Sequence, residues 1–399
     1  MSDRLAIYGG KPTFTRPYPP DFPGAAVIGE EEKRAVLEVL DHRSPFRYYG
    51  PSLLGKVSSF ECNFARRMGT KYALAVSSGT AALMVGLQAL DIRPGQEVIV
   101  PANTFIASAG AVLRRGGKPV YAEIDDTFNL DPEDVKTKIT DRTVAIMPVH
   151  FEGAPCDMDS LLAIARSHGL KIIEDCAQAC GASYHGRPVG SFGEVGTFSF
   201  QINKAITAGE GGAVVTSDAA LYERAVRAHD HGNVRGENGQ FGLDSSGRAF
   251  IAENYRMSEL AGAVLGVQLE KLDMIISRMR AAAAGIRERL RDVDVIRWRR
   301  VVDPEGEIGR RIFMTFADES TALNVLRALI AENLPVARMY NGHPVYDHPQ
   351  LGGPYPYKCP RTEDLLRRTV TLAMSPLLTE EDISDVAIAI RRVVEHFCK

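Results

Sequence analysis

Residues 197–212 of the chain are Thr-Phe-Ser-Phe-Gln-Ile-Asn-Lys-Ala-Ile-Thr-Ala-Gly-Glu-Gly-Gly, and they contain a single lysine, Lys204. An apolar run at 196–200 precedes this lysine, and a glycine-rich turn leads from it into the apolar run 212–216. Short apolar runs bounded by glycine and polar residues are typical of strands. The stretch therefore predicts a strand, a loop that carries Lys204, and a second strand.

A carboxylate ends another predicted strand upstream of this lysine. The apolar run 170–173 leads into Glu-Asp-Cys-Ala-Gln at 174–178, which places Asp175 twenty-nine positions before Lys204. In α/β folds, ligands bind at the carboxyl ends of the strands. Pyridoxal phosphate requires a lysine that forms a Schiff base and an acid that keeps the pyridine nitrogen protonated. Lys204 and Asp175 are the predicted catalytic pair, and a helix N-cap is the alternative role of Asp175.

A phosphate site is expected beside this pair. Ser-Ser-Gly-Thr at 77–80 follows the apolar run 72–76 and begins a helical pattern, so its N–H groups and hydroxyls suit an anion. Ser199 is a further phosphate ligand by prediction, because on a strand its side chain faces away from Phe198 and Phe200.

Two other side chains are candidates for contacts to the cofactor ring. Phe105 follows the apolar run 97–100, where its ring could stack on the pyridine. Gln178 lies three residues after Asp175 and could reach the phenolic oxygen. Packing in the core is the alternative role of Phe105, and a structural glutamine is the alternative for Gln178.

Short apolar runs alternate with helical patterns between residues 70 and 217. The predicted strands are residues 72–76, 97–100, 118–123, 144–148, 171–174, 196–200 and 212–216, and the predicted helices are residues 80–90, 105–114 and 158–168. Such alternation predicts an α/β fold with a largely parallel sheet and helices on both faces.

The remainder of the chain suggests three parts. Residues 1–27 are rich in proline and glycine and predict an extended arm; a helix is expected at 30–41. A long helical region at 258–290 precedes a strand at 311–316 and helices at 319–332 and 379–397, the last with a capping box of Thr379 and Asp382. We therefore expect an arm (1–27), a large cofactor-binding domain (28–275) and a smaller α+β domain (276–399).

Composition excludes several classes of function. The net charge of −3 predicts no general attraction to nucleic acid or to anionic membranes, and no apolar run approaches the roughly 18 residues of a membrane span. The first residues lack the apolar region of a signal peptide. Six cysteines without a Cys-x-x-Cys motif predict reduced thiols and a cytoplasmic protein.

Other catalytic motifs are missing or incomplete. His229 and His231 offer two ligands without a spaced third or fourth, so no metal site is expected. No Gly-x-Ser-x-Gly motif of an α/β-hydrolase occurs. The glycines at 209–212 follow the lysine, which is the wrong order for a phosphate-binding Walker loop.

Four motifs stand out in the chain: Glu-Asp-Cys-Ala-Gln at 174–178, the lysine stretch at 198–212, Ser-Ser-Gly-Thr-Ala-Ala at 77–82 and Asn-Tyr-Arg-Met-Ser-Glu at 254–259. Together they resemble the DegT/StrS family of sugar aminotransferases. The resemblance covers nearly the whole chain. It implies the aspartate-aminotransferase-like (type I) fold and a homodimer with its active site at the subunit interface.

The resemblance also implies a role for each matching residue. Lys204 is the Schiff-base lysine and Asp175 the partner of the pyridinium nitrogen. Phe105 stacks on the ring and Gln178 contacts its phenolic side. The implied phosphate ligands are Ser78, Gly79, Thr80 and Ser199, with Asn254 from the neighbouring subunit.

The substrates implied are glutamate or glutamine as amino donor and a keto or aldehyde group of a sugar or cyclitol as acceptor. The chain is similar to two branches, the 8-amino-octulosonate aminotransferases and the aminocyclitol and 3-amino-5-hydroxybenzoate group. Residues 46–60 and 232–252 depart from the common pattern and are expected to form substrate loops.

Two residues are predicted to contact the substrate. Arg47 could pair with a substrate carboxylate, and His343 lies where family members sometimes reach the substrate; a surface position is the alternative for each. Some family members replace the lysine by histidine and are dehydratases, so Lys204 favours transamination. A lyase on the same scaffold and a non-catalytic regulatory protein are the rival interpretations.

Overall fold

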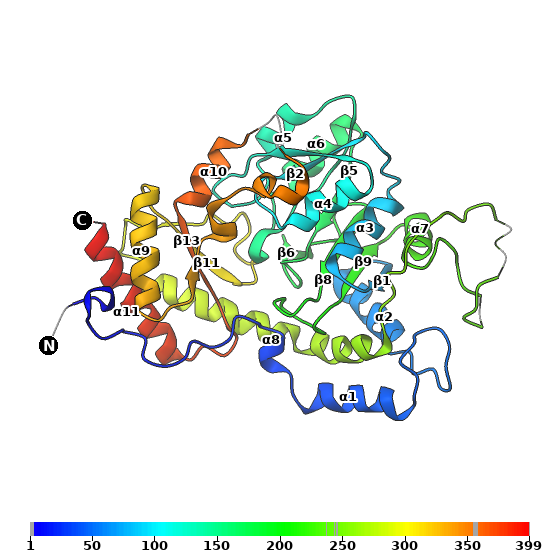
Figure 1. Ribbon diagram of the computed structural model, residues 1–399, viewed down its shortest axis with the longest axis horizontal. Helices are drawn as coiled ribbons and strands as arrows, with labels where there is room; N and C mark the ends of the chain where they lie inside the picture. Colours follow the sequence, from blue (N-terminus) through cyan, green and yellow to red (C-terminus); the bar gives the residue numbers. More distant parts are fainter. Residues whose placement is uncertain (1–3, 237, 243, 245, 354–357, 399) are drawn as a thin grey trace.

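A large sheet of seven strands forms the centre of the molecule (Figure 1). The computed structural model describes residues 4–236, 238–242, 244, 246–353 and 358–398. The sheet order is β1 (Tyr72–Val76), β9 (Gly212–Thr216), β8 (Val195–Ser199), β5 (Lys171–Asp175), β4 (Thr143–Ile146), β2 (Glu97–Pro101) and β3 (Lys118–Ala122). The seven strands predicted from the sequence are these seven, with ends that differ by at most two residues.

The sheet is mostly parallel, as predicted. Strands β3, β2, β4, β5 and β8 pair in parallel, whereas β9 is antiparallel to both β8 and β1. Because only the Lys204 loop joins β8 to β9, the chain has no room for a crossover helix and must reverse direction. The loop therefore lies at the carboxyl end of β8, beside that of β5.

Helices cover both faces of this sheet. On one face, the apolar cluster that includes Leu74 and Ile173 packs against α3 (Gly79–Ala89), α4 (Ile106–Arg114) and α7 (Ala219–His229). On the other face lie α2 (Lys56–Met68), α5 (Pro132–Lys138), α6 (Met158–His168) and α8 (Glu259–Arg289). A two-stranded hairpin of β6 (Ser183–Tyr184) and β7 (Arg187–Pro188) lies outside the sheet.

The C-terminal part is a smaller α+β unit. Its antiparallel sheet has the order β10 (Arg297–Trp298), β11 (Arg311–Thr315), β13 (Thr369–Ala373) and β12 (Val336–Ala337). Its helices are α9 (Glu319–Ala331), α10 (Pro360–Arg367) and α11 (Glu380–Phe397), and the predicted capping box of Thr379 and Asp382 begins α11.

Helix α8 joins the two units. It runs without interruption for 31 residues, so residue 275, the predicted domain boundary, lies inside it. Figure 1 shows α8 beneath both sheets, with α1 (Glu30–Asp41) on its outer side. One apolar cluster includes Phe198 of the large sheet, Leu272 of α8 and Ile312 of the small sheet. The two sheets therefore share a core.

The N-terminal arm crosses from the small unit to the large one (Figure 1). It contains two short 3-10 helices, η1 (Ala6–Tyr8) and η2 (Ala25–Val27). Phe14 is fully buried, and the Tyr18 hydroxyl donates to the carbonyl of Ala373 in β13 at 2.7 Å. Further along, the Gly24 N–H donates to the carbonyl of Lys204 at 3.3 Å. The arm is thus fixed at both ends of a segment that passes the lysine loop.

One expected loop is in part a core helix. Residues 46–60 were expected to form a substrate loop, but Lys56–Met68 is helix α2, and Phe60 and Phe64 are buried. The prediction was wrong for the helical part, because its apolar residues are spaced for one face of a helix that packs against α8. Sequence analysis also did not identify α5, α7, α10, β10, β12 and β13.

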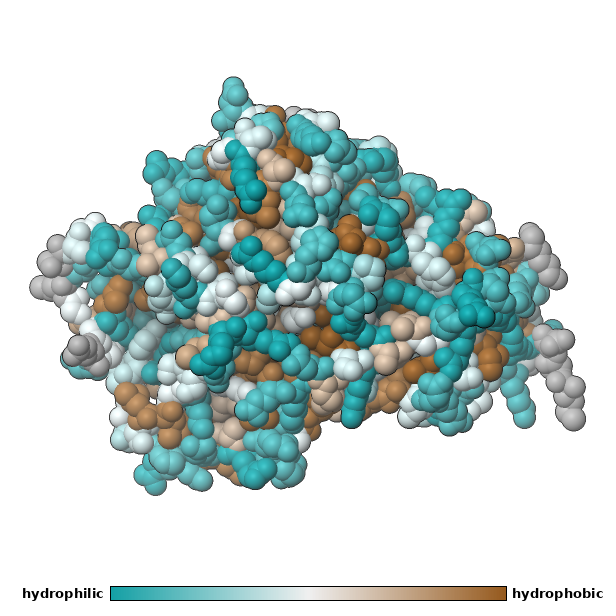
Figure 2. Space-filling view, turned by 180° about the vertical axis from the view of Figure 1, so that it is seen from behind, coloured by the Kyte–Doolittle hydropathy of each residue, from teal (hydrophilic) through white to brown (hydrophobic). Residues whose placement is uncertain are grey.

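Apolar residues on the face shown in Figure 2 occur in small areas among polar ones. Within the described residues, none of the helices has the length and apolar character needed to cross a membrane.

Phe64 of α2 supports the strand that leads to Lys204. Its ring meets those of Phe198 and Phe200 edge-on, with centroids 5.0 and 5.4 Å away. We expect Phe64→Ala to lower the free energy of unfolding by about 3–5 kcal/mol, because it leaves a cavity in this cluster. Chemical denaturation measures the loss, and Phe64→Leu, which keeps most of the volume, should lose less. An unchanged unfolding midpoint for Phe64→Ala would contradict this packing role.

Candidate active site

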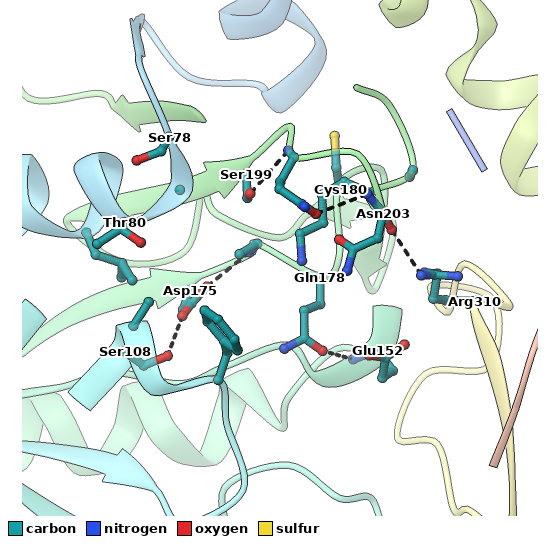
Figure 3. Close-up of a pocket in the computed structure, with 18 of the residues that line it drawn as sticks. Ser78, Thr80, Ser108, Glu152, Asp175, Gln178, Cys180, Ser199, Asn203 and Arg310 are labelled. Atoms are coloured by element: carbon teal, nitrogen blue, oxygen red, sulfur yellow. Dashed lines mark hydrogen bonds between the residues drawn. The ribbon is translucent and has the colours of Figure 1, made fainter. Parts of the chain in front are cut away.

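A cavity of about 680 Å³ lies at the carboxyl ends of β5 and β8. Its lining includes eight of the residues singled out in the sequence: Ser78, Gly79, Thr80, Phe105, Asp175, Gln178, Ser199 and Lys204. In Figure 3, Ser78 and Thr80 lie on one side, Glu152 and Arg310 lie on the opposite side, and Asp175 and Gln178 lie between them. Segments distant in sequence thus meet in one cavity.

Asp175 is a buried carboxylate at the end of β5. It pairs with Thr197 of β8, and its side chain accepts hydrogen bonds from the Ser108 hydroxyl at 2.8 Å and from the Ala177 N–H at 3.0 Å. The Thr104 hydroxyl lies 2.7 Å from that of Ser108, so Thr104 donates to Ser108. Burial raises the pKa of Asp175 above its ordinary value, and the Ser108 hydrogen bond opposes this shift. The carboxylate is oriented by these bonds and can hold a cation beside it.

Lys204 extends into the same cavity from the loop after β8. Its N–H donates to the Gln201 carbonyl at 2.9 Å, which forms the turn that carries it. Its Nζ makes no hydrogen bond or ion pair with any residue that the structure describes. Burial lowers the pKa of Lys204, whereas the Glu152 carboxylate raises it and Arg310 lowers it further. The net decrease favours the neutral, nucleophilic amine.

The start of α3 forms an anion site in the cavity. The Ser78 hydroxyl accepts from the Ala81 N–H at 3.0 Å and caps the helix. Gly79 and Thr80 begin the helix, so their N–H groups have no acceptor within it. A Cβ at Gly79 would lie 2.6 Å from the Cβ of Ser199, so only glycine lets the helix approach this serine. Ser199 faces α3, whereas Phe198 and Phe200 face the opposite core, as predicted.

Gln178 is held between two residues with strained backbones. Its side-chain oxygen accepts from the Glu152 N–H at 3.1 Å, and its amide donates to the Tyr340 hydroxyl at 3.4 Å. Glu152 and Tyr340 have φ angles of 46° and 47°, which cost roughly 1–3 kcal/mol each in non-glycine residues. Phe105, at the start of α4, is exposed, and its ring lines the cavity.

A charged wall, formed by Asp21, Glu152, Arg310 and Arg311, closes the side of the cavity nearest the small sheet. Asp21 pairs with both arginines, and Arg311 Nε also pairs with Glu152 at 3.2 Å. Sequence analysis missed these residues, because they come from the arm, from the segment after β4, and from the first residue of β11 and the residue before it. The only indication in the sequence was the pair of adjacent arginines after Gly309, and this pair belongs to no recognised motif.

Three predicted site residues lie outside this cavity. Asn254 lines an adjacent cavity of about 670 Å³ together with Thr80 and Phe105. The side chain of Arg47 is largely buried, with its Nη2 2.7 Å from Glu61 Oε2. His343 is exposed, with its Nδ1 3.2 Å from Asp347 Oδ2. The substrate contacts of Arg47 and His343 stay predictions.

His150, Glu174 and Cys176, the last two on either side of Asp175 in the sequence, form a buried group with ligand atoms within 4.8 Å of one another. Glu174 accepts three backbone N–H groups, those of Gly190, Phe192 and Gly193, each at 2.7 Å. His150 Nε2 lies 3.1 Å from Glu174, and His150 Nδ1 accepts from the Cys156 N–H. These bonds occupy the ligand atoms of His150 and Glu174 and tie the end of β5 to the neighbouring loops.

Glu152 should control the protonation of Lys204. Because its carboxylate favours the ammonium form, Glu152→Gln should lower the pKa of Lys204 and move the onset of amine reactivity to lower pH. Acetic anhydride labelling across a pH series, read by peptide mass spectrometry, gives the midpoint for Lys204, with labelling of exposed Lys33 as reference. Glu305→Gln, an exposed acid that does not line the cavity, is the matched control. A midpoint that stays unchanged or rises would contradict the assignment.

Comparison with known proteins agrees with this geometry. The model of the DegT/DnrJ/EryC1/StrS aminotransferase family matches residues 26–391. The chain is 37% identical to the GDP-perosamine synthase of Escherichia coli O157:H7, over 88% of this chain and 93% of that protein. It is 35% identical to the L-glutamine:2-deoxy-scyllo-inosose aminotransferase of Streptomyces fradiae, over 99% of both chains.

Solved structures show the same fold. A crystal structure of 3-amino-5-hydroxybenzoic acid synthase matches with a TM-score of 0.86 and 30% identity, covering 96% of this chain and 100% of that one. The structure of DesI in the presence of its TDP-sugar product matches with a TM-score of 0.83 and 32% identity, covering 98% and 96%. The predicted aspartate-aminotransferase-like fold is confirmed, and the chain belongs to the DegT/DnrJ/EryC1/StrS aminotransferase family.

Proposed function

We propose that the protein uses pyridoxal phosphate to move an amino group from glutamate or glutamine to a keto or aldehyde group of a sugar or cyclitol. The observation that carries this proposal is the convergence of three groups in one cavity: the unpaired Lys204 amine, the buried Asp175 carboxylate and the free start of α3.

The residues present fit the cofactor. The close approach of Gly79 to Ser199 forms a cradle that any larger side chain would fill, and helix N–H groups with nearby hydroxyls suit a phosphate. Across the cavity, the oriented carboxylate of Asp175 suits a protonated ring nitrogen. Lys204 would attach the cofactor, Phe105 would cover its ring, and the Gln178 amide would contact its phenolic oxygen.

Lys204 and Asp175 would have separate chemical roles in this reaction. Pyridoxal phosphate supplies an electron sink for the carbon that loses a proton. Once the amine of the donor has displaced it from the cofactor, Lys204 would be the base in the cavity, because its lowered pKa would leave its amine free to take that proton and return it at a neighbouring atom. Asp175 would keep the ring nitrogen protonated, because a buried carboxylate favours a cation beside it.

The names of the relatives support the substrate class. One relative acts on an inosose with L-glutamine as its named amino donor, and another is a synthase of the GDP-linked amino sugar perosamine. Both are similar to this chain over most of their length, which favours a sugar or cyclitol acceptor here.

We also propose a homodimer that works in the cytoplasm. Apolar side chains at and before α1, Ile28, Leu37 and Leu40, are exposed and give a second copy a surface to bury. Asn254 lines the cavity next to the active site, where a neighbouring subunit could complete the phosphate site. All six cysteines are free, which suits a reducing compartment.

Replacement of Lys204 tests the covalent chemistry. We expect Lys204→Ala, incubated with pyridoxal phosphate, to lack the visible absorption band of the lysine-bound cofactor and to show no turnover. The unmodified protein should show the band and lose it when glutamate or glutamine is added. The exposed variant Lys33→Ala serves as the control. A band at full intensity in Lys204→Ala would overturn the assignment.

Replacement of Asp175 tests the electronic role separately. Asp175→Asn keeps the shape of the side chain but removes its charge, so turnover should fall by roughly 100-fold or more. The cofactor should still attach to Lys204, which the absorption spectrum reports. Ordinary turnover in Asp175→Asn would show that this carboxylate has no such role.

A further inference from the structure

The charged wall contains two adjacent arginines whose guanidinium groups converge. Neighbouring side chains on a strand point to opposite faces. Arg311 is the first residue of β11, however, and Arg310 precedes the strand directly after Gly309, which has a φ of 69°. A Cβ at Gly309 would lie 2.7 Å from the backbone of Arg280, so this turn requires glycine. The turn lets both arginines line the cavity and remain largely buried.

A single carboxylate of the protein bridges this pair. One oxygen of Asp21 pairs with Arg310, and the other lies 3.2 Å from Arg311 Nη2. Arginine recognises carboxylates strongly through such charge-assisted bonds. Glu152 pairs with Arg311 from the other side. Two cations and two carboxylates therefore balance each other at the cavity wall.

The pair lies next to the reactive lysine. Arg310 Nη2 donates to the carbonyl of Asn203, the residue before Lys204, at 3.0 Å, as Figure 3 shows for Asn203 and Arg310. Arg310 is also among the charges that lower the pKa of Lys204. An amino acid whose nitrogen is near Lys204 would thus have its carboxylate within reach of Arg310.

We propose that Arg310 and Arg311 bind a carboxylate of the amino donor, and that Asp21 occupies this subsite until the donor displaces it. The proposal rests on the proposed function, because it concerns the donor of that reaction. Exchange of Asp21 for a donor carboxylate keeps two acids against two arginines. A donor bound in addition to Asp21 would place three acids there, which like-charge repulsion opposes.

The arm permits this exchange without detaching. Tyr18 and Gly24 hold it on either side of Asp21 through bonds to Ala373 and Lys204. Asp21 is the more exposed member of its ion pairs, with 32% of its side chain exposed against 8% for Arg310. The side chain of Asp21 can therefore rotate into the solvent, whereas the arginines stay in place.

Binding of glutarate tests the subsite without transamination, because glutarate carries carboxylates but no amine. Calorimetric titration of the pyridoxal-phosphate-loaded protein gives its Kd. We expect Asp21→Asn, which removes the internal competitor, to bind glutarate roughly tenfold more tightly, and Arg310→Met to bind it roughly tenfold or more weakly. Asp292→Asn, a surface acid paired with Arg391, should match the unmodified protein.

Two outcomes would overturn the proposal: unchanged or weaker glutarate binding by Asp21→Asn, or unchanged binding by Arg310→Met. Melting temperatures identify variants that fail to fold, and Arg310→Lys, which keeps the charge, should recover part of the affinity if folding of Arg310→Met is impaired. A different measurement would contradict the proposed function: the lysine-bound absorption band would be absent, or it would not respond to glutamate. Calorimetry in the presence of pyridoxal phosphate gives the glutarate affinity whether or not that band forms.

Discussion

A carboxylate with almost no contact to water, that of Asp175, is the constraint on which the active site depends. Such a group is costly unless hydrogen bonds and a nearby cation compensate for the lost water. Ser108 supplies one bond, so the first turn of α4 must lie over the end of β5. The Lys204 loop must follow β8 on the adjacent strand. The order of the strands and the placement of α4 therefore both provide the contacts that stabilise the Asp175 carboxylate.

The parts of the site that the sequence predicts are those set by local rules. Strand ends that carry Asp175, Ser199 and the serine–glycine turn before α3 lie at one edge because the strands are parallel, and this follows from alternating patterns. The opposite wall could not be predicted in this way. Arg310 and Glu152 come together because the small sheet packs beside the cavity, and no sequence pattern indicates that contact.

The same distinction accounts for the wrong prediction at 46–60 and for the ion pair of Arg47, which the sequence did not reveal. The region 46–60 departs from the common family pattern and so suggests a loop, although Phe60, together with Phe64 just beyond the region, has the spacing of a buried helix face. Arg47 attracts attention as a charge between aromatic residues, yet it pairs with Glu61, whose other oxygen accepts the N–H of Ala75 in β1. A charge partner that lies far along the chain can be recognised only in three dimensions.

Helix α8 constrains how this enzyme can move. With 31 residues at 1.5 Å each, it is roughly 46 Å long, and its side chains belong to the core that both sheets share. A hinge between the sheets would have to bend this rod or pull it from its packing. Because Lys204 comes from one sheet and Arg310 from the other, their separation is in effect set by the stiffness of the rod. Opening for substrates should then come from loops and single side chains, so the geometry of the cavity around Lys204 is retained.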